Sequence, residues 1–321
     1  MKKIGILFGQ ESSFPPALVE RVNQKTEGKK IVAEFVRIDK VVQGETCGYD
    51  VIIDRISQDV PFYRGFLKNA ALSGCAVVNN PFWWSADEKF FNNSLATKIG
   101  VTVPRTVLLP SHQVPPDTND SSFRNLAYPM DWEGIFKYVG WPAYFKPFAG
   151  GGWKNVYKLN NPDEFFRAYS ETGQLVMMLQ EEVTFDMYFR CYSIDQSEVR
   201  IMNYEPRHPY HLRYQTDWQP PTDVLEKVRE GVLTLNQYLG YDLNTVEFAI
   251  RDGVPVAIDF CNPAPDAEVA SVGQANFDWV VDAVSDMAIR KAREHQPGRD
   301  NLSWGKFVQA AVARRELREP A

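Results

Sequence analysis

The feature that most constrains this chain is the alternation of short apolar segments and helix-like segments over its first 84 residues. The apolar segments predict buried strands, and the segments 15–25 and 61–73 between them predict helices. This β-α-β order predicts a mostly parallel, doubly wound sheet, because parallel neighbours need a crossover connection. The expected strands are residues 4–8, 31–38, 49–54 and 76–79.

Ligands of such sheets bind at the carboxyl ends of the strands. Gln10 and Ser12 follow the first expected strand, and Arg55 follows the third. The rule makes these three residues candidates for substrate binding, with Glu11 and Ser13 beside them. The ordinary polarity of strand-to-helix loops explains the same residues about equally well.

Composition excludes several classes of protein. Against 35 Lys and Arg stand 41 Asp and Glu, so the 321-residue chain has a formal net charge of −6, which disfavours broad nucleic-acid binding. No stretch approaches the ~20 apolar residues that span a bilayer, and the first apolar run is too short for a secretory signal. The four cysteines form no C-x-x-C pair, so we expect no zinc site, no disulfide framework and a cytoplasmic location.

A run of three glycines, Gly150, Gly151 and Gly152, lies between two strand-like segments. Adjacent glycines let backbone N–H groups approach an anion closely, and Lys146 lies four residues before them. Each feature alone fits a mobile turn or a solvated lysine at a strand edge. Together they indicate a cradle for phosphate.

Two carboxylates lie in a late hairpin, residues 245–260. With a three-residue loop at 251–253, strand alternation places Glu247 and Asp259 on one face, one step apart. Neighbouring carboxylates repel each other unless a cation lies between them, and Mg²⁺ prefers oxygen ligands. Two solvated carboxylates are the alternative interpretation. Asn262 would join the pair only if a bulge redirected its side chain.

Two further segments carry polar groups. Residues 180–183 predict a strand end whose free backbone groups pair with the edge of an adenine, and Asp186 lies where a carboxylate would hold ribose hydroxyls. A charged loop is the alternative. A cationic group indicates a carboxylate or phosphate ligand, or equally a loop with internal ion pairs; it comprises Arg190, Arg207, His208, His211 and Arg213.

Taken in chain order, these segments resemble the motifs of the ATP-grasp superfamily. Glu88-Lys89, Leu95 and residues 100–104 resemble its D-K…L…G-[IV]-P-V-P motif, with Glu88 in place of Asp and Thr102 in place of a proline. Residues 141–147 resemble its strand ending in K-P, and 150–152 its glycine-rich lid turn. Residues 180–183 resemble its hinge Q-E-x-[IV].

The remaining likeness lies in the C-terminal half. Only Arg190 of residues 188–190 agrees with the superfamily's D-[IVL]-R. Glu247, Asp259 and Asn262 resemble its metal trio, although the usual E-x-N reads here Asp259-Phe260-Cys261-Asn262, with one extra residue and a shorter acid. The resemblance covers the whole chain.

The resemblance implies an α/β and α+β fold in three parts. A Rossmann-like domain (1–84) is followed by an ATP-grasp N-terminal subdomain with the glycine-rich lid (85–178) and a C-terminal subdomain with the metal hairpin and C-terminal helices (179–321). It implies ATP and Mg²⁺ as cofactors. It assigns ATP binding to Lys89, Lys146, Gly150, Gly151, Gly152, Glu181, Glu182, Val183 and Asp186, and metal binding to Glu247, Asp259 and Asn262. Arg190 is expected to bind substrate, together with Gln10, Ser12 and Arg55 from the strand-end rule.

The implied activity is the joining of a carboxylate to an amine through an acylphosphate, with release of ADP and phosphate. Arg207 or Arg213 would neutralise the acylphosphate, which is a hypothesis from local charge. The substrates are expected to be small molecules, amino acids or a peptide, and a homodimer is expected from the habit of the family. Two alternatives are a kinase-like phosphotransferase and a nucleotide-binding regulator without turnover.

Overall fold

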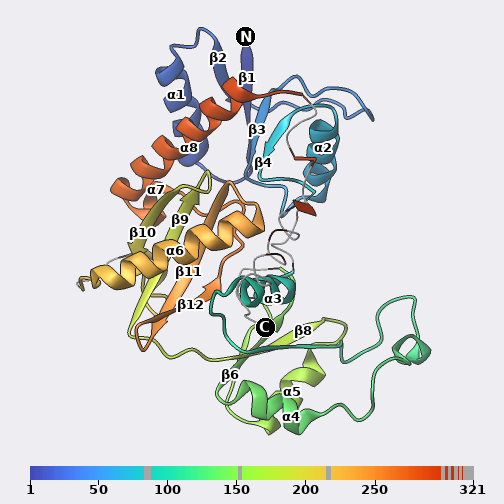
Figure 1. Cartoon of the computed structure of the whole chain (residues 1–321). Coiled ribbons are helices and arrows are strands. Elements are labelled where there is room, and N and C mark those ends of the chain that lie inside the picture. The colour runs from blue at the N-terminus through green and yellow to red at the C-terminus, as the bar shows by residue number, and fades with distance from the viewer. Residues whose placement is uncertain are drawn as a thin grey trace.

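The computed structural model describes residues 1–82, 88–150, 154–214 and 218–297, with residues 301, 302, 305, 306, 310 and 313 near the C-terminus. Within these residues the strands form three four-stranded sheets, which follow one another from top to bottom in Figure 1. One sheet is parallel and two are antiparallel. The mixed α/β and α+β class predicted from the sequence is therefore confirmed.

The N-terminal sheet is parallel, with strand order β2-β1-β3-β4. Its two crossover helices are α1 (Phe14–Thr26) and α2 (Pro61–Leu72), and both begin with a proline in the first turn, where the missing N–H costs no hydrogen bond. Each predicted strand is present; the first is one residue longer than expected, and the other three are one to three residues shorter. The strands are β1 (Lys2–Leu7), β2 (Ile31–Phe35), β3 (Val51–Asp54) and β4 (Ala76–Val78).

The two faces of this sheet are covered by helices from different parts of the chain. Leu67 and Ala70 of α2 pack on one face, and α1 lies against the other together with α8 (Gln274–Glu294). In Figure 1, α8 lies beside α1 across the N-terminal sheet. This long helix therefore belongs to the packing of the N-terminal domain, although the sequence places it 190 residues beyond the expected domain boundary.

The second sheet forms the lower part of the molecule, in the order β5-β8-β6-β7. Helices α4 (Trp132–Val139) and α5 (Pro162–Glu171) begin at Asp131 and Asn161, whose side chains accept hydrogen bonds from the backbone of the first turn. Their aromatic side chains, with those of the sheet, form a separate core. The strands are β5 (Thr106–Leu109), β6 (Ala143–Pro147), β7 (Tyr157–Leu159) and β8 (Met177–Glu181).

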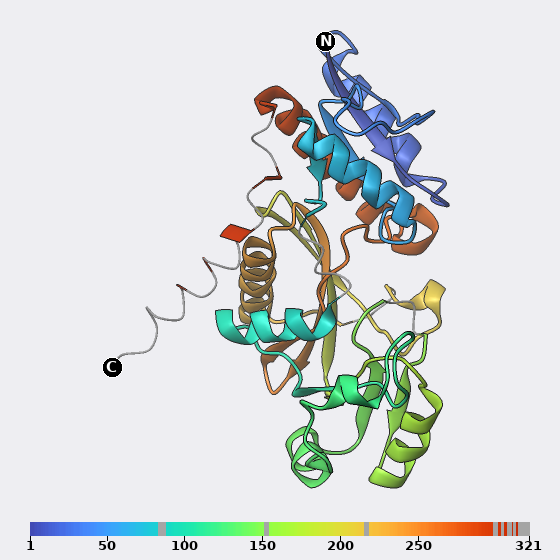
Figure 2. The same ribbon diagram turned by 90° about the vertical axis from the view of Figure 1, so that its right-hand side faces the viewer.

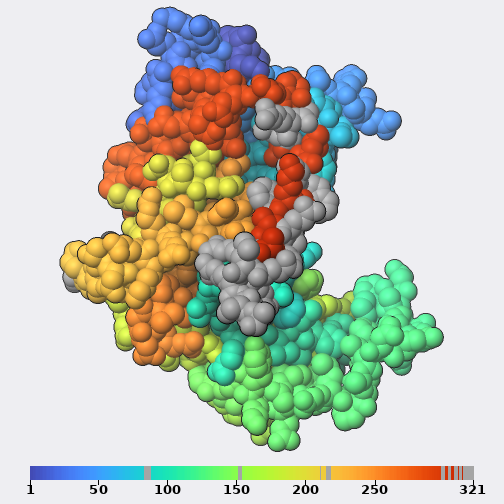
Figure 3. Space-filling model, in the orientation of Figure 1, coloured from blue at the N-terminus to red at the C-terminus, as the bar shows by residue number. Residues whose placement is uncertain are grey.

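Residues 110–130 connect β5 to α4 and project from the body of the molecule, at the lower right of Figure 3. They form a surface segment, as the Pro-, Ser-, Asn- and Asp-rich composition predicts. Their one regular element is a short 3₁₀ helix at Asp120–Phe123. The expected boundary between residues 178 and 179 falls within β8, so this strand contains residues of both expected subdomains.

The third sheet has the order β10-β9-β11-β12 and is antiparallel throughout. One face is covered by α6 (Thr222–Leu239), to which α3 (Lys89–Ile99) adds its buried side chains, as Figure 2 shows from the side. Gly231 of α6 permits this approach, since a Cβ there would lie 2.8 Å from the ring of Phe248. The strands are β9 (Met187–Ile194), β10 (Glu198–Asn203), β11 (Leu243–Arg251) and β12 (Val254–Asp259).

The opposite face of the third sheet is divided in two. Next to the N-terminal domain, Tyr192, Ile194 and Leu243 join the core formed by α1 and α8. Farther along, the same face carries the side chains of Arg190, Glu247 and Asp259 toward the second sheet, as described below. No helix in the described part of the chain is both long enough and apolar enough to cross a membrane.

Candidate active site

The hairpin β11–β12 brings two carboxylates directly opposite each other. Its turn has two residues, Asp252 and Gly253, with φ of 54° and 72°, so the three-residue loop expected from the sequence is wrong. From that turn, regular pairing would place Ile258 opposite Glu247. A bulge between Glu247 and Phe248 shifts the register by one, and Asp259 becomes the partner of Glu247.

The bulge also corrects the expected offset. The sequence predicted Glu247 and Asp259 on one face, one step apart, and the structure pairs them directly. The observed pairing also places even-numbered residues of the two strands on opposite faces of the sheet. Phe248 faces α6, whereas Val256 lies on the other face with Ala249. A two-residue turn gives this parity, and the Asp-Gly dipeptide is the sequence signal for it.

Lys89 is the first residue of α3 and faces this carboxylate pair. Its Nζ lies 3.5 Å from Oδ1 of Asp259, and its backbone N–H donates to the carbonyl of Phe148 at 2.8 Å. The charge of Asp259 raises the pKa of Lys89, an effect that burial opposes and to which Cys261 and Glu247 add. Lys89 thus links the third sheet to the strand end that leads into the glycine turn.

Lys146 approaches the same carboxylates from β6 of the second sheet. Burial and, to a lesser extent, the nearby charge of Lys89 lower its pKa to about 8, against the opposing effect of Asp259 and Glu247. Among the described residues its ammonium group has no ion-pair partner within bonding distance. Two ammonium groups and two carboxylates therefore meet between the second and third sheets.

Glu247 is held by residues of β9. The hydroxyl of Tyr188 donates to its carboxylate at 2.7 Å, and Nε of Arg190 lies 3.8 Å from it. Burial raises the pKa of Glu247, the charge of Arg190 opposes this, and Asp259 adds to it. Arg190 also donates from Nη1 to the hydroxyl of Tyr214 at 3.1 Å, while its buried Nε has no hydrogen-bond partner.

The strand end at Glu181 joins the two antiparallel sheets. Its carboxylate is 6% exposed and forms ion pairs with Arg105 and with Arg251, the latter at 3.0 Å from the last residue of β11. The side chain of Glu182 accepts from Lys158 at 2.7 Å. Both carboxylates are thus occupied by this chain, so a ligand would meet the backbone of this segment and not these side chains.

Apolar side chains lie beside that backbone, on the face of the third sheet that carries Glu247. They form one cluster, into which Val183 brings the segment that follows β8. Asp186 is exposed, and its backbone N–H donates to the carbonyl of Ile250 at 3.1 Å. The cluster comprises Val183, Tyr188, Tyr204, Ala249 and Val256, with Phe185, Tyr214 and Ile258 packed against it.

Two basic residues lie in the segment that follows β10. Arg207 is 66% exposed and makes two hydrogen bonds, of 2.7 and 2.6 Å, to the carboxylate of Glu205, while its guanidinium lies 4.6 Å from the ring of Phe185. Arg213 donates from Nη1 to the hydroxyl of Tyr204 at 3.2 Å. Both therefore lie around the same aromatic cluster as Arg190.

No family model and no curated protein matches this sequence, whereas solved structures match nearly its whole length. The D-alanine–D-alanine ligase of Bacillus anthracis, complexed with ATP, is 14% identical, with a TM-score of 0.63 over 92% of this chain and 98% of its own. A RimK domain ATP-grasp protein of Sphaerobacter thermophilus is 13% identical, with a TM-score of 0.63 and coverage of 89% and 99%. The chain has the ATP-grasp fold.

A third similar structure is the macrocyclase MdnC of Microcystis aeruginosa, bound with the precursor peptide MdnA. It is 12% identical, with a TM-score of 0.58 over 90% of this chain and all of its own. At such identities the likeness concerns the fold, which confirms the ATP-grasp resemblance of the sequence motifs. Lys89, Lys146, Glu247 and Asp259 lie between the two antiparallel sheets of this fold.

Of the three glycines predicted to form the lid turn, Gly150 is among the described residues. Gly150 has a φ of 81°, which favours glycine, and nothing lies within 4 Å of where its Cβ would be. Gly151 and Gly152 lie outside the described residues. The open surroundings of Gly150 agree with a turn that leaves room for a ligand.

The side chain of Asn262 is directed back at β11. Its Nδ2 donates to the carbonyl of Thr245 at 3.3 Å, and its backbone N–H donates to the side chain of Asn244 at 2.7 Å. The bulge lies before Asp259 and not after it. The role of Asn262 as a metal ligand stays a prediction.

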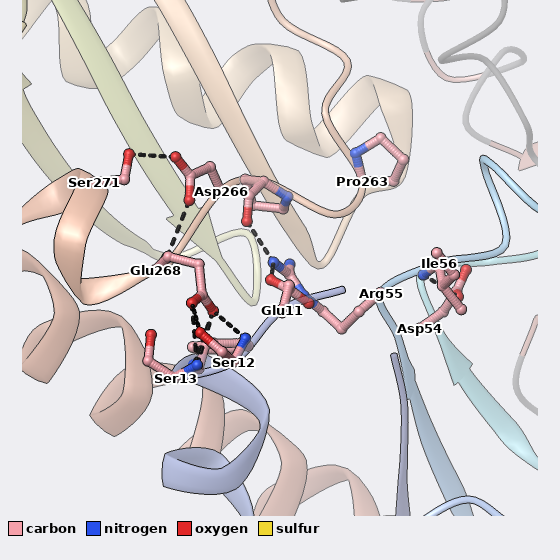
Figure 4. A network of polar contacts seen from close by, with 12 residues as sticks. Glu11, Ser12, Ser13, Asp54, Arg55, Ile56, Pro263, Asp266, Glu268 and Ser271 are labelled. Atoms are coloured by element: carbon pink, nitrogen blue, oxygen red, sulfur yellow. Dashed lines mark hydrogen bonds and ion pairs between the residues drawn. The ribbon is translucent and has the colours of Figure 1, made fainter. Parts of the chain in front are cut away.

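Two of the residues expected to bind substrate at the N-terminal rim, Ser12 and Arg55, lie in a different network, shown in Figure 4. Glu268, which follows the hairpin, accepts from the hydroxyl of Ser12 at 2.8 Å and from the backbone of Ser12, Ser13 and Phe14 at 3.1 to 3.2 Å. Burial raises the pKa of Glu268, but these hydrogen bonds outweigh it and lower the pKa to about 2. Glu268 therefore caps the N-terminus of α1.

Arg55 completes this network. Its side chain is 1% exposed and pairs with Glu11, and its Nη2 also donates to the carbonyl of Pro265 at 2.5 Å. Gln10 is exposed. Ser12 and Arg55 thus connect the N-terminal domain to the loop after β12, and substrate binding by Gln10, Ser12 and Arg55 stays a prediction.

The carboxylate pair fits a divalent cation. Two carboxylates in direct register repel each other, and each has one cation only at some distance, Lys89 at 3.5 Å from Asp259 and Arg190 at 3.8 Å from Glu247. No group of three or more His, Cys, Asp and Glu side chains is placed to hold a metal within the described ranges. Glu247 and Asp259 would therefore hold the ion with help from oxygen atoms that a ligand brings.

Sequence analysis missed Tyr188 and Arg251 at the site, and Glu268 in the network at the N-terminal rim. Tyr188 lies two positions before Arg190 on β9, so strand alternation already placed both on one face. Arg251 and Glu268 carried no such signal, because both act across long stretches of chain, on Glu181 and on Ser12. Such pairings follow from tertiary packing and not from spacing.

Proposed function

We propose that this protein is an ATP-dependent ligase that joins a carboxylate to an amine through an acylphosphate, releasing ADP and phosphate. One observation carries the proposal: Glu247 and Asp259 face each other in register, and Lys89 and Lys146 approach them from two other elements. Such a set of charges suits a triphosphate and a divalent cation, and phosphoryl transfer depends mainly on positioning and charge neutralisation.

In this proposal the two lysines hold phosphate oxygens. Lys89 extends from the N-terminus of α3, where the helix dipole also favours an anion, and Lys146 is buried with a lowered pKa, which a phosphate ligand would restore. The turn at Gly150, Gly151 and Gly152 would cover the phosphates with backbone N–H groups. Glu247, Asp259 and Asn262 would hold Mg²⁺, which neutralises charge on the phosphates when bound.

The base of ATP would lie on the apolar cluster beside β8. The backbone of Glu181, Glu182 and Val183 would meet the edge of the adenine, because the two carboxylates are engaged in ion pairs and Val183 belongs to the cluster. The N–H groups of Glu181 and Glu182 already donate to backbone carbonyls, which leaves their carbonyls and Val183 for this contact. Asp186 would hold the ribose.

The carboxylate substrate would lie between Arg190 and the segment that follows β10. Its oxygen attacks the γ-phosphorus, the bond to the β-phosphate oxygen breaks, and ADP leaves. The amine nitrogen then attacks the acyl carbon, phosphate leaves, and the nitrogen loses a proton. Arg207 or Arg213 would neutralise the acylphosphate, and Gln10, Ser12 and Arg55 would contact one substrate from the N-terminal domain.

The similar structures include a D-alanine–D-alanine ligase and an enzyme bound with a precursor peptide, which supports amino acids or a peptide as substrates here. The test is a screen for ADP release over amino acids and small acids, offered in pairs with MgATP. We expect ADP only when a carboxylate and an amine are both present. The control is the Glu247→Gln, Asp259→Asn double variant, which should release none.

Two outcomes would replace the proposal. ADP release without an amine, together with a stable phosphorylated product, would identify a kinase-like phosphotransferase. ATP binding without ADP release under every substrate mixture of the screen would identify a nucleotide-binding regulator.

A further inference from the structure

The backbone that follows Asp259 is not part of a strand. Glu247 and Asp259 form the last pair of the β11–β12 ladder. Residues 260–262 then pass Thr245 and Asn244 outside the ladder, and Pro263 follows. The ladder has ended before Pro263, which has no N–H with which to resume it. The direction of the Asp259 carboxylate therefore depends on how this short segment is held.

The side chain of Asn244 holds it. This residue of β11 is fully buried, its Oδ1 accepts from the backbone N–H of Asn262 at 2.7 Å, and its Nδ2 donates to the carbonyl of Phe260 at 2.8 Å. The two backbone groups flank Cys261. One side-chain amide thus gives the segment one acceptor and one donor, as a peptide group of a neighbouring strand would.

The side chain of Asn244 is itself held by a residue of α6. Its second amide hydrogen is donated to Oδ1 of Asn236 at 2.9 Å, and Asn236, also fully buried in α6, donates to the carbonyl of Val232 at 2.8 Å. Exchanging oxygen and nitrogen in Asn244 would place donor against donor at Asn262, so the network sets its orientation. A buried amide with all of these partners is rigid.

A second asparagine holds the far end of the segment. Asn79 follows β4 and is 5% exposed; its Nδ2 donates to the carbonyls of Leu243 and Pro263 at 2.7 and 3.2 Å. Its Oδ1 accepts from the N–H groups of Asp242 and Leu243. Residues 260–263 are thus fixed at both ends by side-chain amides from other elements.

We propose that Asn244 is a positioning residue for the metal-binding carboxylate of Asp259. The inference rests on the proposed function, in which Asp259 and Glu247 share a divalent cation. Asn244 touches neither metal nor substrate; it fixes the backbone immediately after Asp259 and thereby keeps this carboxylate in register with Glu247. Loss of partners that orient a metal ligand typically costs about 10- to 100-fold in metal affinity.

The test compares two buried asparagines of one network. Asn244→Ser removes the bonds to the segment. Asn236→Ser removes a buried amide of the same size whose hydrogen bonds, within the described part of the chain, go to α6 and Asn244, and it leaves both bonds from Asn244 to the segment in place. The readout is the dissociation constant of Mn²⁺ in the presence of saturating ADP, from the electron paramagnetic resonance signal of free Mn²⁺. ADP affinity without metal is measured in parallel.

We expect the Mn²⁺ dissociation constant to rise about tenfold or more in Asn244→Ser and less than threefold in Asn236→Ser, with ADP affinity unchanged in both. Equal Mn²⁺ affinities in the wild type and a folded Asn244→Ser variant would overturn the proposal. If Asn244→Ser does not fold, Asn244→Asp decides, since it keeps the acceptor for Asn262 and loses the donor to Phe260.

The result also separates this inference from the proposed function. If wild-type protein binds no Mn²⁺ with ADP, the metal assignment of Glu247 and Asp259 fails, and the role of Asn244 fails with it. If wild-type protein binds Mn²⁺ and the folded variants bind it equally, only the role of Asn244 is overturned.

Discussion

Two groups of polar and charged residues lie near the loop after β12. They differ in how completely other groups of the chain pair with their charges. The junction cluster, Glu11, Ser12, Arg55 and Glu268, is held together by hydrogen bonds and an ion pair within the chain, and only Nη1 of Arg55 lacks a partner. The hairpin cluster consists of Lys89, Lys146, Glu247 and Asp259.

In the hairpin cluster the charges are incompletely paired. Asp259 has one cation at 3.5 Å, and Lys146 keeps a lowered pKa because burial and a second lysine disfavour its charge. The junction cluster instead gives Glu268 four donors and a pKa of about 2. The difference teaches that charge alone does not mark a ligand site; under the proposed function, the ligand site is where the chain leaves charges without full compensation.

The largest effect is expected for the carboxylates of the hairpin cluster. Replacement by the isosteric amides, Glu247→Gln with Asp259→Asn, should lower ADP release on the order of 10³-fold, because no oxygen pair remains to hold the cation. The free energy of unfolding should stay or rise, since two facing like charges are removed. Activity is measured by ADP release and stability by urea unfolding.

The matched control removes the same number of negative charges, but at exposed positions on the surface. Asp223→Asn with Glu294→Gln removes two carboxylates that are 69% and 64% exposed, and it should retain activity. Wild-type ADP release from the hairpin variant would make the hairpin cluster a structural feature like the junction cluster.

The second effect concerns Lys146. Lys146→Met should lower kcat/KM for ATP by about 10²-fold, because the buried ammonium would contact phosphate directly. Since the pKa of this group in the free protein is about 8, the charged form is lost as the pH rises through 8, and ATP affinity should fall there in the wild type only. Calorimetric titration from pH 7 to 9.5 measures this.

Lys158→Met is the control for Lys146. This lysine lies on the adjacent strand β7 and pairs with Glu182 at the surface, so its loss should change ATP affinity less than threefold. An unchanged pH dependence in Lys146→Met would assign the titration to another group.

For the junction cluster we expect an effect on stability. Glu268→Gln should lower the free energy of unfolding by about 1–2 kcal/mol at pH 7, a value discounted for solvent screening. The pKa of Glu268 is depressed in the folded protein, so this stabilisation is present above about pH 4.5 and is lost as the pH falls toward 2. Urea unfolding at several pH values should show the two proteins converging in acid.

Glu294→Gln, at an exposed position, should follow the wild type at every pH. If Glu268→Gln instead weakened substrate binding without lowering stability, the junction cluster would be part of the ligand site, and the comparison would lose its basis.

The smallest effect is expected for Arg207→Ala. This guanidinium is 66% exposed and already paired with Glu205, so the free energy of unfolding should change by less than about 0.5 kcal/mol. In the same way kcat/KM should change less than threefold, and Arg213→Ala, nearer to the buried Tyr204, should cost more. Greater loss in Arg207→Ala than in Arg213→Ala would give Arg207 the role at the acylphosphate.

Much of this architecture was predictable. Strand and helix periods identified the parallel N-terminal sheet, α6 and the hairpin, because the apolar pattern of an element reports which side it buries. The residue patterns identified Lys146, Glu247 and Asp259, whereas Lys89 and the assembly of the four were inferred from the resemblance to the ATP-grasp superfamily.

The sequence by itself thus determined the elements, their faces and the chemistry of the side chains, since these depend on local geometry. Only the tertiary structure decided the register at the bulge, the pairing of Glu268 with Ser12 and the asparagine network around residues 260–263. A shift of one residue exchanges the faces of a strand, and contacts across more than 200 residues leave no periodic trace. For that reason the residues were foreseeable, while their state of charge compensation was not.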